Sequence, residues 1–421
     1  MLTVAEAIAE IIARVERLPA ARAALADSLG LVLAEDVFSD LDSPPFDKAL
    51  MDGYAVRSID VSTGRARLRV IEEVPAGQVP RRPVGAQEAT RIMTGAPIPA
   101  GADAVVPVEH TRLETGTASA SQVVMETTPL TAGRNILKRG ESIRKGERVL
   151  NAGRRIRPQE TGCLAELGKD AVAVYPRPRV AVLATGDELV PVNEVPGPGQ
   201  IRNSNEAMLV AQLRRLGAEP VPLGIARDRH AELADRIARG LGCDMLLLSG
   251  GVSAGKLDLV PAVLAEVGVR QVFHKVRVKP GQPVWFGVLE RPEGPGAGDV
   301  EGKHAAGQPP CCVFGLPGNP VSSMVCCELF AGTAVRRLMG IEPAAPTPTR
   351  ARMKKDHFNG GTRPTYHPAW CEATETGNVV EPVRWVGSAD LCATAEANAM
   401  VLFPEGERIY PAGTMVDVFL W

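Results

Sequence analysis

Acidic side chains that could bind a metal ion follow three short apolar runs in the middle of the chain. Asp187 and Glu188 follow the first run, Asp228 follows the second, and Asp258 lies beyond the glycines after the third. If the runs are neighbouring strands of a parallel sheet, these residues lie along the edge where such sheets bind ligands. Mg²⁺ suits that arrangement, because it commonly binds one or two carboxylates together with substrate phosphates. A single acidic residue there is more often an N-cap, so only the group supports the prediction.

Three basic residues stand at alternate positions further along, at Lys275, Arg277 and Lys279. In an extended strand this spacing places all three on one face and the intervening valines on the other. One interpretation is an exposed edge strand that its charges protect from aggregation. The other is a site for phosphate or another oxyanion, favoured by the turn 280–283 that follows. Since the net charge of the chain is only -2, such a site would be local.

Two glycine-containing turns accompany these residues. The first, Ser249–Gly255, interrupts an apolar run, and its glycines can adopt positive φ and expose N–H groups to an anion. The second contains Gly318, after which Asn319 is a predicted N-cap and Pro320 the first residue of a helix that continues over 321–338. We expect the acidic residues, Lys279 and the positive end of that helix dipole to meet in one crevice at the carboxyl edge of the sheet.

The elements that position these residues alternate between strands and helices. Apolar runs and apolar periodicity predict strands at 180–184, 221–225 and 245–248 and helices at 204–216, 230–241 and 257–264. Repeated alternation of this kind is typical of a doubly wound α/β sheet.

The flanking regions predict further domains, as expected for a chain of 421 residues. The N-terminal segment has helical periodicity, with a capping box at Thr3 and Glu6 and a second helical stretch over Ala23–Leu29. Short apolar runs separated by Gly and Pro indicate a small β domain within 67–149 and another after Gly340.

The composition of the chain argues against two classes of partner, nucleic acids and membranes. A net charge of -2 argues against a general nucleic-acid partner, and the absence of an 18-residue apolar run argues against a membrane partner. The eight cysteines include no Cys-x-x-Cys, which favours reduced thiols in a cytoplasmic protein. No Walker motif or nucleophile elbow is present. The Gly- and Pro-rich segment 291–310 is predicted to be a surface loop.

A set of motifs occurs in a fixed order along nearly the whole chain. They are Pro44–Phe46, Met51–Val56, Ile92–Pro97, Thr185–Leu189, Ser249–Ser253, Lys279–Gly281 and Gly315–Pro320. Together they resemble the molybdopterin molybdenumtransferase family, also called MoeA, which is related to the gephyrin E domain. The combination is far more specific than any one motif.

The resemblance implies a multidomain α/β plus β protein that forms a homodimer in the cytoplasm. An elongated N-terminal domain would comprise residues 1–44 and 147–177, with a small β domain, 45–146, inserted in it. A doubly wound, molybdopterin-binding α/β domain would follow at 178–340, and a C-terminal β-barrel would complete the chain at 341–421.

The resemblance also implies the reaction. The enzyme would bind adenylylated molybdopterin, insert molybdate into its dithiolene and hydrolyse the pyrophosphate bond, releasing AMP with the aid of Mg²⁺. The metal ion would be held by Asp187, Glu188 or Asp258.

Site residues are carried over by matching motifs. The catalytic set is Asp52, Thr94, Glu188, Asp228, Asp258, Lys275 and Lys279. The ligand-binding set is Gly250, Gly251, Ser253, Pro317, Gly318, Asn319, Pro320, Arg363 and Ser388. The resemblance implies that the lysines hold oxyanions and the glycines hold the pterin or its phosphate. Asp52 and Thr94 would come from the other subunit of the dimer.

The chain departs from the family pattern at three charged positions. Leu137 and Ser142 stand where family members often carry Arg and Asp, and Lys256 stands where an acidic residue is frequent. Three alternatives also stay open. One is a non-catalytic scaffold of the gephyrin kind, although the long linker and extra N-terminal domain of that branch are not in this sequence. Another is the related adenylyltransferase, which the flanking β domains disfavour. The third is a paralogue that uses tungstate, which has nearly the size and charge of molybdate.

Overall fold

The chain divides into two compact units in the computed structural model, which describes residues 1–114, 121–252, 259–291 and 309–421. The first unit comprises Met1–Glu35, Gly153–Thr161 and Ala171–Trp421. The second comprises Asp36–Ala152 and Gly162–Asp170. Each unit has its own apolar core, so each is described separately.

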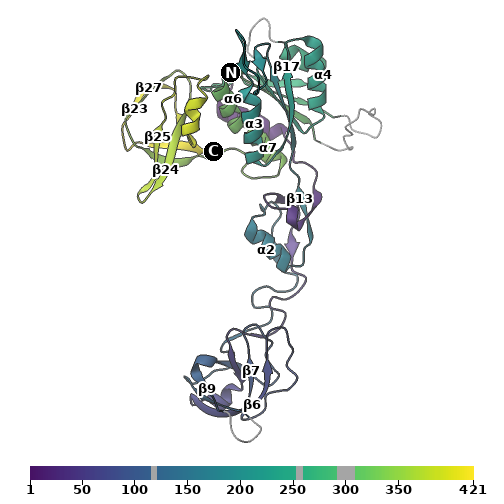
Figure 1. Cartoon of the computed structure of the whole chain (residues 1–421), viewed down its shortest axis with the longest axis vertical. Coiled ribbons are helices and arrows are strands. Elements are labelled where there is room, and N and C mark those ends of the chain that lie inside the picture. Colours follow the sequence, from purple (N-terminus) through teal and green to yellow (C-terminus); the bar gives the residue numbers. More distant parts are fainter. Residues whose placement is uncertain (115–120, 253–258, 292–308) are drawn as a thin grey trace. The chain divides into compact units, whose positions relative to one another are not determined.

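A six-stranded sheet forms the centre of the first unit (Figure 1). Its order is β17 (Glu219–Ala226), β14 (Arg179–Thr185), β18 (Met245–Ser249), β21 (Cys311–Leu316), β20 (Trp285–Leu289) and β19 (Arg270–His274). The first four strands are parallel, whereas β20 and β19 each run antiparallel to the preceding strand. Strands β14, β18 and β21 are buried over almost their whole length, which explains why they read as continuous apolar runs.

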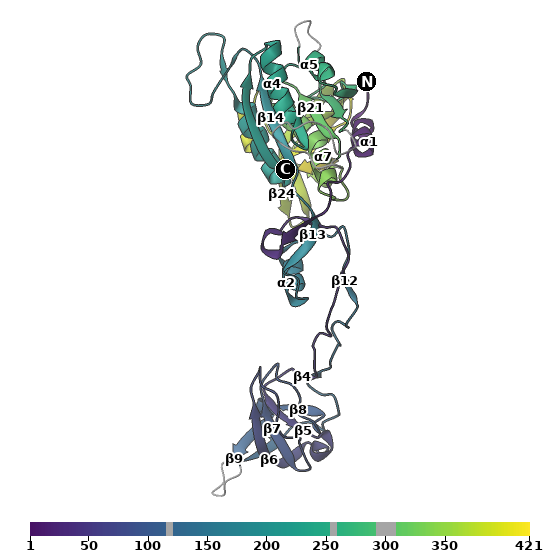
Figure 2. The ribbon, with the colours of Figure 1, turned by 90° about the vertical axis from the view of Figure 1, so that its right-hand side faces the viewer.

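Helices cover both faces of this sheet (Figure 2). On one face α4 (His230–Leu241) and α5 (Val260–Glu266) contribute Leu233, Ile237 and Val263 to a core shared with β14 and β18. Helix α3 (Ser204–Leu216) contacts α6 (Pro320–Cys326) and α7 (Gly332–Leu338) on the other face. The doubly wound α/β fold that the sequence predicts is therefore confirmed.

Two predicted helices differ from the structure. Helix α5 begins at Val260, three residues later than the periodicity indicates. The helix predicted over 321–338 is three consecutive pieces, because a π-helical segment, Cys327–Ala331, separates α6 from α7. Asn319 and Pro320 do stand at the N-cap and first turn of α6, as predicted.

The prediction of one strand through Lys275, Arg277 and Lys279 is wrong, because the observed strand ends before these residues. Strand β19 ends at His274, and Lys275 has a positive φ of 72°, which stops the extended run. The alternation of burial nevertheless persists: Val276 and Val278 are fully buried, whereas Lys279 is exposed. Isolated bridges to other segments, not a continuous strand, hold these residues.

The N-terminal helix α1 (Val4–Arg14) begins with the predicted capping box, in which Thr3 and Glu6 satisfy each other's backbone N–H groups. The second predicted helix is wrong. Residues Ala21–Ala24 form strand β1, which pairs antiparallel with β13 (Ala171–Tyr175), and a single 3₁₀ turn, Leu25–Asp27, follows. Backbone pairing with a distant strand outweighs the helix propensity of the alanines. Strand β2 (Val32–Leu33) lies on the other side of β13.

The first unit ends in a closed β-barrel, which confirms the predicted C-terminal barrel. Its strands are β22 (Thr349–Met353), β25 (Gly377–Pro382), β24 (Thr365–Thr374), β26 (Ala399–Phe403) and β28 (Met415–Leu420). A separate hairpin pairs β23 (His357–Gly361) with β27 (Gly406–Tyr410). Inward-facing side chains such as Val380, Val401 and Val418 fill the barrel.

The second unit is built on another six-stranded sheet. Its order is β8 (Ala104–Pro107), β5 (Gly53–Val56), β7 (Glu88–Ile92), β6 (Arg65–Val74), β10 (Gln122–Glu126) and β9 (Thr111–Glu114). Two short pairs accompany it, β4 (Lys48–Ala49) with β11 (Ile136–Leu137) and β3 (Val37–Phe38) with β12 (Arg148–Leu150). This unit is the small β domain expected from the short apolar runs, although the domain boundaries given above stay predictions.

Among the described residues, no helix is long and apolar enough to cross a membrane. All eight cysteines are free thiols. Burial raises the pKa of Cys311 to about 12, so this thiol stays protonated at neutral pH.

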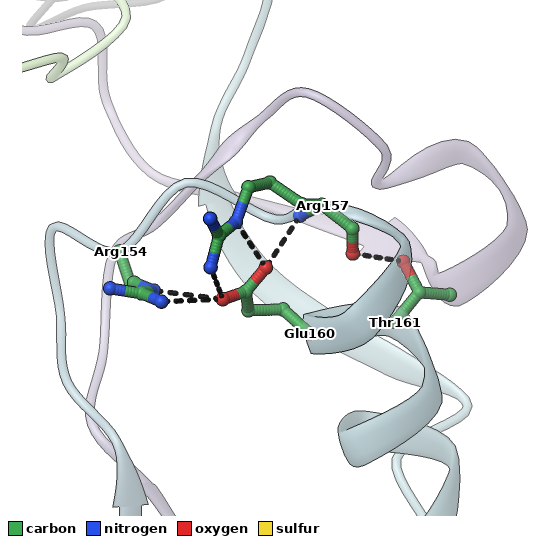
Figure 3. Close-up of polar contacts among 4 residues, drawn as sticks. All are labelled: Arg154, Arg157, Glu160 and Thr161. Carbon is green, nitrogen blue, oxygen red and sulfur yellow. Dashed lines mark hydrogen bonds and ion pairs between the residues drawn. The ribbon is translucent and has the colours of Figure 1, made fainter.

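A buried carboxylate anchors helix α2 (Pro158–Glu166) (Figure 3). Glu160 accepts from the Arg154 Nε at 2.9 Å and from the backbone N–H of Arg157 at 3.0 Å, and the Arg157 guanidinium binds both of its oxygens. The exposed fraction of the Glu160 side chain is 4%, whereas the two arginines are about half exposed. Because the hydrogen bonds from Arg157 favour the ionised form, they hold the pKa of Glu160 well below its usual range.

Replacing Glu160 with Gln leaves charged donors without a charged acceptor. We expect Glu160→Gln to lower the free energy of unfolding of this region at pH 7 by about 1–3 kcal/mol. The depressed pKa means that the stabilisation is present above the ordinary carboxyl value of 4.5 and is lost as the pH falls below it. Thermal melts at pH 7 and at acidic pH should therefore show a gap that closes on acidification. The exposed Glu375→Gln is the control, and a gap independent of pH would contradict the assignment.

Candidate functional site

The carboxyl ends of the parallel strands lie side by side, as the sequence predicts. In register, Thr185 of β14 lies opposite Ala226 of β17, Ala184 lies opposite Ser249 of β18, and Ser249 lies opposite Leu316 of β21. The loops that follow these strands therefore start from one edge of the sheet, and they carry most of the predicted site residues.

Glycines allow these loops to touch. Gly250 has a φ of 99°, and a Cβ there would lie 2.5 Å from the carbonyl oxygen of Thr185. Gly251 has a φ of 64°, and a Cβ there would lie 2.6 Å from a methyl group of Val260. A Cβ on Gly318 would lie 3.8 Å from the Cα of Gly250. Side chains at Gly250 and Gly251 would force the loops apart. Ser253 and Asp258, both predicted site residues, lie outside the described residues.

A chain of hydrogen bonds connects helix α3 to the loop after β21. The Nδ2 of Asn205 donates to the hydroxyl of Ser249 at 2.7 Å and to the carbonyl oxygen of Gly318 at 2.8 Å. The Ser323 hydroxyl lies 3.4 Å from that of Ser249 and donates to the Pro317 carbonyl at 2.8 Å. Since carbonyl oxygens only accept, the two ends determine the direction of the whole chain.

Two buried oxygens at this edge have no hydrogen-bond partner among the described residues: Asn205 Oδ1 and Thr185 Oγ1. Thr185 is only 3% exposed, and its Oγ1 lies against Gly250 and Gly251. An unsatisfied buried oxygen costs about 1–3 kcal/mol, so a ligand or water molecule that supplied a donor here would stabilise this edge of the sheet.

The acidic residues after β14 and β17, Asp187, Glu188 and Asp228, are exposed. Asp187 accepts from the backbone N–H of Asp228 at 3.3 Å, and the Glu188 carboxylate lies over Gly186, where a Cβ would be 2.4 Å from Oε2. Arg227 ties the two loops together by donating to the Asp187 carbonyl at 2.8 Å. In the described part of the chain, no group of three His, Cys, Asp or Glu side chains could hold a metal ion.

A cavity of about 530 Å³ lies between the start of α6 and the barrel. Five predicted residues line it: Lys279, Pro317, Asn319, Arg363 and Ser388. The rest of its wall is Pro280, Gly281, Gln282, Pro283, Ser322, His357, Phe358, Asn359, Gly360, Thr365, His367, Trp385, Val386 and Gly387. This described wall contains Lys279 and Arg363 but no carboxylate, so it favours an anion.

Backbone pairing places the two cations. Lys279 N–H donates to the Pro364 carbonyl at 2.9 Å, and Tyr366 N–H donates to the Lys279 carbonyl at 2.7 Å. The Arg363 guanidinium donates back to the Val278 carbonyl at 3.3 Å and to the side chain of Gln282. Lys279 and Arg363 therefore belong to one rigid corner of the cavity.

Asn319 connects the opposite wall to the barrel. Its Nδ2 donates to the hydroxyl of Ser388 at 3.0 Å, and the N–H of Val321 donates to the Ser388 carbonyl at 3.0 Å. As the N-cap of α6, Asn319 makes no side-chain capping bond, because its side chain is used in this contact. Pro320, the first residue of α6, comes directly after the lining residue Asn319 and does not itself line the cavity.

The acidic residues and the cations do not share this cavity. The expectation of a single hollow holds for Lys279 but not for Asp187, Glu188 or Asp228, none of which lines it. Lys275 does not line it either, since its positive φ turns the chain and its N–H donates to the Val284 carbonyl.

In the second unit, Asp52 and Thr94 are joined directly. The backbone N–H and the hydroxyl of Thr94 both donate to Asp52 Oδ1 at 2.7 Å. The backbone N–H of Thr94 is the main cause that holds the pKa of Asp52 below its usual range, and the side-chain bond adds to it. Asp52 is therefore ionised at neutral pH.

Sequence reasoning missed several polar residues of both sites: Thr185, Asn205, Ser323, Gln282, His367 and Trp385. A weak signal was present for one of them, because Ser323 is a polar residue near the start of the largely apolar helix α6. His367 and Trp385 carry no local signal.

The structure is that of an α/β protein with a mixed sheet, glycine turns at the carboxyl edge of that sheet, and a cavity whose described wall has two cations and no carboxylate, which suits an anionic small molecule. Three family models match the chain: "MoeA N-terminal region (domain I and II)" at 2–168, "Probable molybdopterin binding domain" at 181–337 and "MoeA C-terminal region (domain IV)" at 350–421. The chain belongs to the MoeA family. Its role therefore lies in molybdenum cofactor biosynthesis.

Related proteins are similar to this chain over all or nearly all of its length. A molybdopterin molybdenumtransferase of Staphylococcus aureus (strain COL) is 35% identical, covering 100% of this chain and 95% of its own. One of Staphylococcus epidermidis is 33% identical, covering 94% and 90%. A crystal structure of the molybdopterin biosynthesis MoeA protein of Pyrococcus horikoshii OT3 superposes with a TM-score of 0.79 at 27% identity, covering 100% of both chains.

The hydrogen-bond chain from Asn205 makes a directional prediction. Asn205→Ala removes two donors and should lower the free energy of unfolding by about 1–3 kcal/mol. Asn205→Asp keeps the shape but sets an acceptor against the Gly318 carbonyl, so it should destabilise more than alanine does. Denaturant unfolding measures both, and hydrogen exchange at Gly250 N–H reports on the loop. The exposed Asn193→Ala is the control. An aspartate variant as stable as the alanine variant would show that the chain is not oriented this way.

Proposed function

We propose that the protein is a molybdopterin molybdenumtransferase, a transferase that inserts molybdate into the dithiolene of adenylylated molybdopterin and releases AMP. The observation that supports this most directly is the cavity in which Lys279 and Arg363 stand without a carboxylate. Family membership supplies the substrate class, since relatives that match the full length carry this name. Water adds across the phosphate anhydride and releases AMP and the pterin phosphate. Each dithiolene sulfur that binds molybdenum displaces a molybdate oxygen, which leaves as water with protons from the thiols and the solvent.

The cavity is the proposed oxyanion site. A tetrahedral dianion has oxygens that accept from the Lys279 ammonium and from the Arg363 guanidinium, and both are charge-assisted bonds. Arg363 is already oriented by its bonds to Gln282 and the Val278 carbonyl. The neutral groups of Ser388 and Asn319 at the other wall would complete the hydrogen bonding.

The glycine crevice is the proposed site of the pterin or its phosphate. Gly250 and Gly251 would bring backbone within reach of a ligand. The neighbouring segment 317–320 contributes Pro317 and Asn319 to the wall of the cavity, and Gly318 lies against Gly250. The unpaired oxygens of Asn205 and Thr185 are suited to the N–H groups of a pterin ring. One ligand could then extend from this crevice to the oxyanion cavity.

Mg²⁺ would be held by Asp187 and Glu188, together with phosphate oxygens of the ligand. The described carboxylates fit that partial role and not a complete protein site. When bound, Mg²⁺ would neutralise charge on the phosphates. Asp258 was predicted as a further ligand, while Asp228 and Lys275 are proposed to act at the rim, outside the cavity.

We propose that the protein works as a cytoplasmic homodimer. Each active site would then combine Lys279 of one subunit with Asp52 and Thr94 from the second unit of the other subunit. Asp52 and Thr94 form a preorganised acid and hydroxyl pair that lies far along the chain from Lys279. An ionised Asp52 would accept a proton or orient a ligand donor.

Lys279→Gln tests the oxyanion site. We expect at least a hundredfold loss of molybdate-dependent AMP release, because one of the two charge-assisted contacts to the oxyanion is removed. The matched control is Arg277→Gln, whose guanidinium pairs with Glu405 and does not line the cavity. The assay supplies pterin-adenylate, Mg²⁺ and either molybdate or tungstate. Undiminished release by the Lys279 variant at wild-type stability would reject the assignment.

A mixing experiment tests the shared site. Lys279→Gln and Asp52→Asn should each be inactive alone. If each site takes these residues from different subunits, subunit exchange of an equal mixture should restore about a quarter of wild-type AMP release, since half of the dimers gain one intact site. Restoration should require exchange, so a cross-linked mixture is the control. No restoration after verified exchange would place both residues in one subunit's site.

A further inference from the structure

An indole N–H in the cavity wall has no acceptor. Trp385 lines the cavity together with Lys279 and Arg363. Its Nε1 is buried and has no hydrogen-bond partner among the described residues. A buried indole N–H usually finds an acceptor, because it loses its water on folding. A neutral donor without a partner therefore belongs to a residue that lines the same cavity as the two cations.

Packing orients this ring. Trp385 meets His367 edge to face, with ring centroids 5.1 Å apart and an interplanar angle of 85°. His367 is fixed in turn, since its Nδ1 lies 2.8 Å from the Pro368 carbonyl, an oxygen that can only accept. The His367 Nδ1 therefore carries hydrogen. Burial is the main cause that lowers the pKa of His367 to about 4, and the nearby His357 and Lys279 contribute to this shift, so the imidazole is neutral at pH 7.

The chemistry of the surrounding wall defines the missing acceptor. Lys279 and Arg363 exclude a cationic ligand and attract an anion. A tetrahedral oxyanion has more oxygens than these two cations serve, so a neutral N–H can bind another oxygen without adding positive charge. The volume of about 530 Å³ also leaves room for a larger group that carries the oxyanion.

We propose that Trp385 Nε1 donates a hydrogen bond to an oxygen of the oxyanion in this cavity, and that Trp385 is thereby a binding residue. The inference rests on the proposed function, because it takes molybdate as the oxyanion. The indole N–H of Trp385 would orient the oxyanion without adding positive charge to the cavity. His367 is a positioning residue that holds the ring through its edge-to-face contact.

Trp385→Phe keeps an aromatic ring and removes the N–H. Calorimetric titration with molybdate alone, and with tungstate alone, should show affinity about tenfold weaker, which corresponds to 1.4 kcal/mol. In the absence of ligand the variant should melt at or above the wild-type temperature, since an unpaired donor has been removed. The control is Trp370→Phe, an exposed tryptophan on β24 of the same barrel.

A second measurement observes the N–H itself. With ¹⁵N-labelled tryptophan, the four indole signals are assigned by substitution, and the Trp385 signal should move downfield when molybdate is added. The Trp370 signal should stay in place.

The outcomes separate the two claims. A wild-type protein that binds neither oxyanion would overturn the oxyanion assignment under the proposed function, and this inference with it. A wild-type protein that binds molybdate, with Trp385→Phe binding equally well and the Trp385 signal unmoved, would overturn this inference alone. That result would mean that a water molecule satisfies the indole.

Discussion

Two backbone hydrogen bonds between Lys279 and the barrel residues Pro364 and Tyr366 hold the candidate oxyanion cavity together. They attach the turn after β19 to the start of β24, so that the α/β sheet and the barrel share one wall. Together with the bonds from the Arg363 guanidinium to the Val278 carbonyl and to Gln282, they keep Lys279 and Arg363 in one cavity wall, although two cations repel each other at short range. The protein uses main-chain bonds to keep like charges close, and this leaves the charges available to an anion.

The strongest local patterns predicted the fold well. Helices α3 and α4 have the predicted bounds, because apolar periodicity and their connections to buried strands agree. Predictions failed where distant residues decide the conformation. Residues Ala21–Ala24 pair with β13, about 150 positions away in sequence, and the run after β19 is broken by the positive φ of Lys275. Neither effect is visible in a window of ten residues.

The candidate site was predictable only in part, for the same reason. Lys279 lies in a recognisable motif, Arg363 and Ser388 were matched to the family as single residues, and the structure brings all three to one cavity. Asn205 could not be found, because its role depends on Gly318, 113 positions away, and on a serine at the end of β18. The acidic residues were expected in the same hollow from the sheet edge alone. Sheet topology predicts that these loops start from the carboxyl edge of the sheet, but it does not predict how far each loop reaches from that edge. The Glu188 side chain folds back over Gly186.

The most direct test of the account is diffraction at the molybdenum absorption edge from crystals of the full chain soaked in molybdate. The account predicts one dominant anomalous peak in the cavity, within hydrogen-bond reach of the Lys279 ammonium and the Arg363 guanidinium. A dominant peak at the Gly250–Gly251 crevice, or beside Lys275, with the cavity empty, would contradict the central claim that these two cations form the oxyanion site.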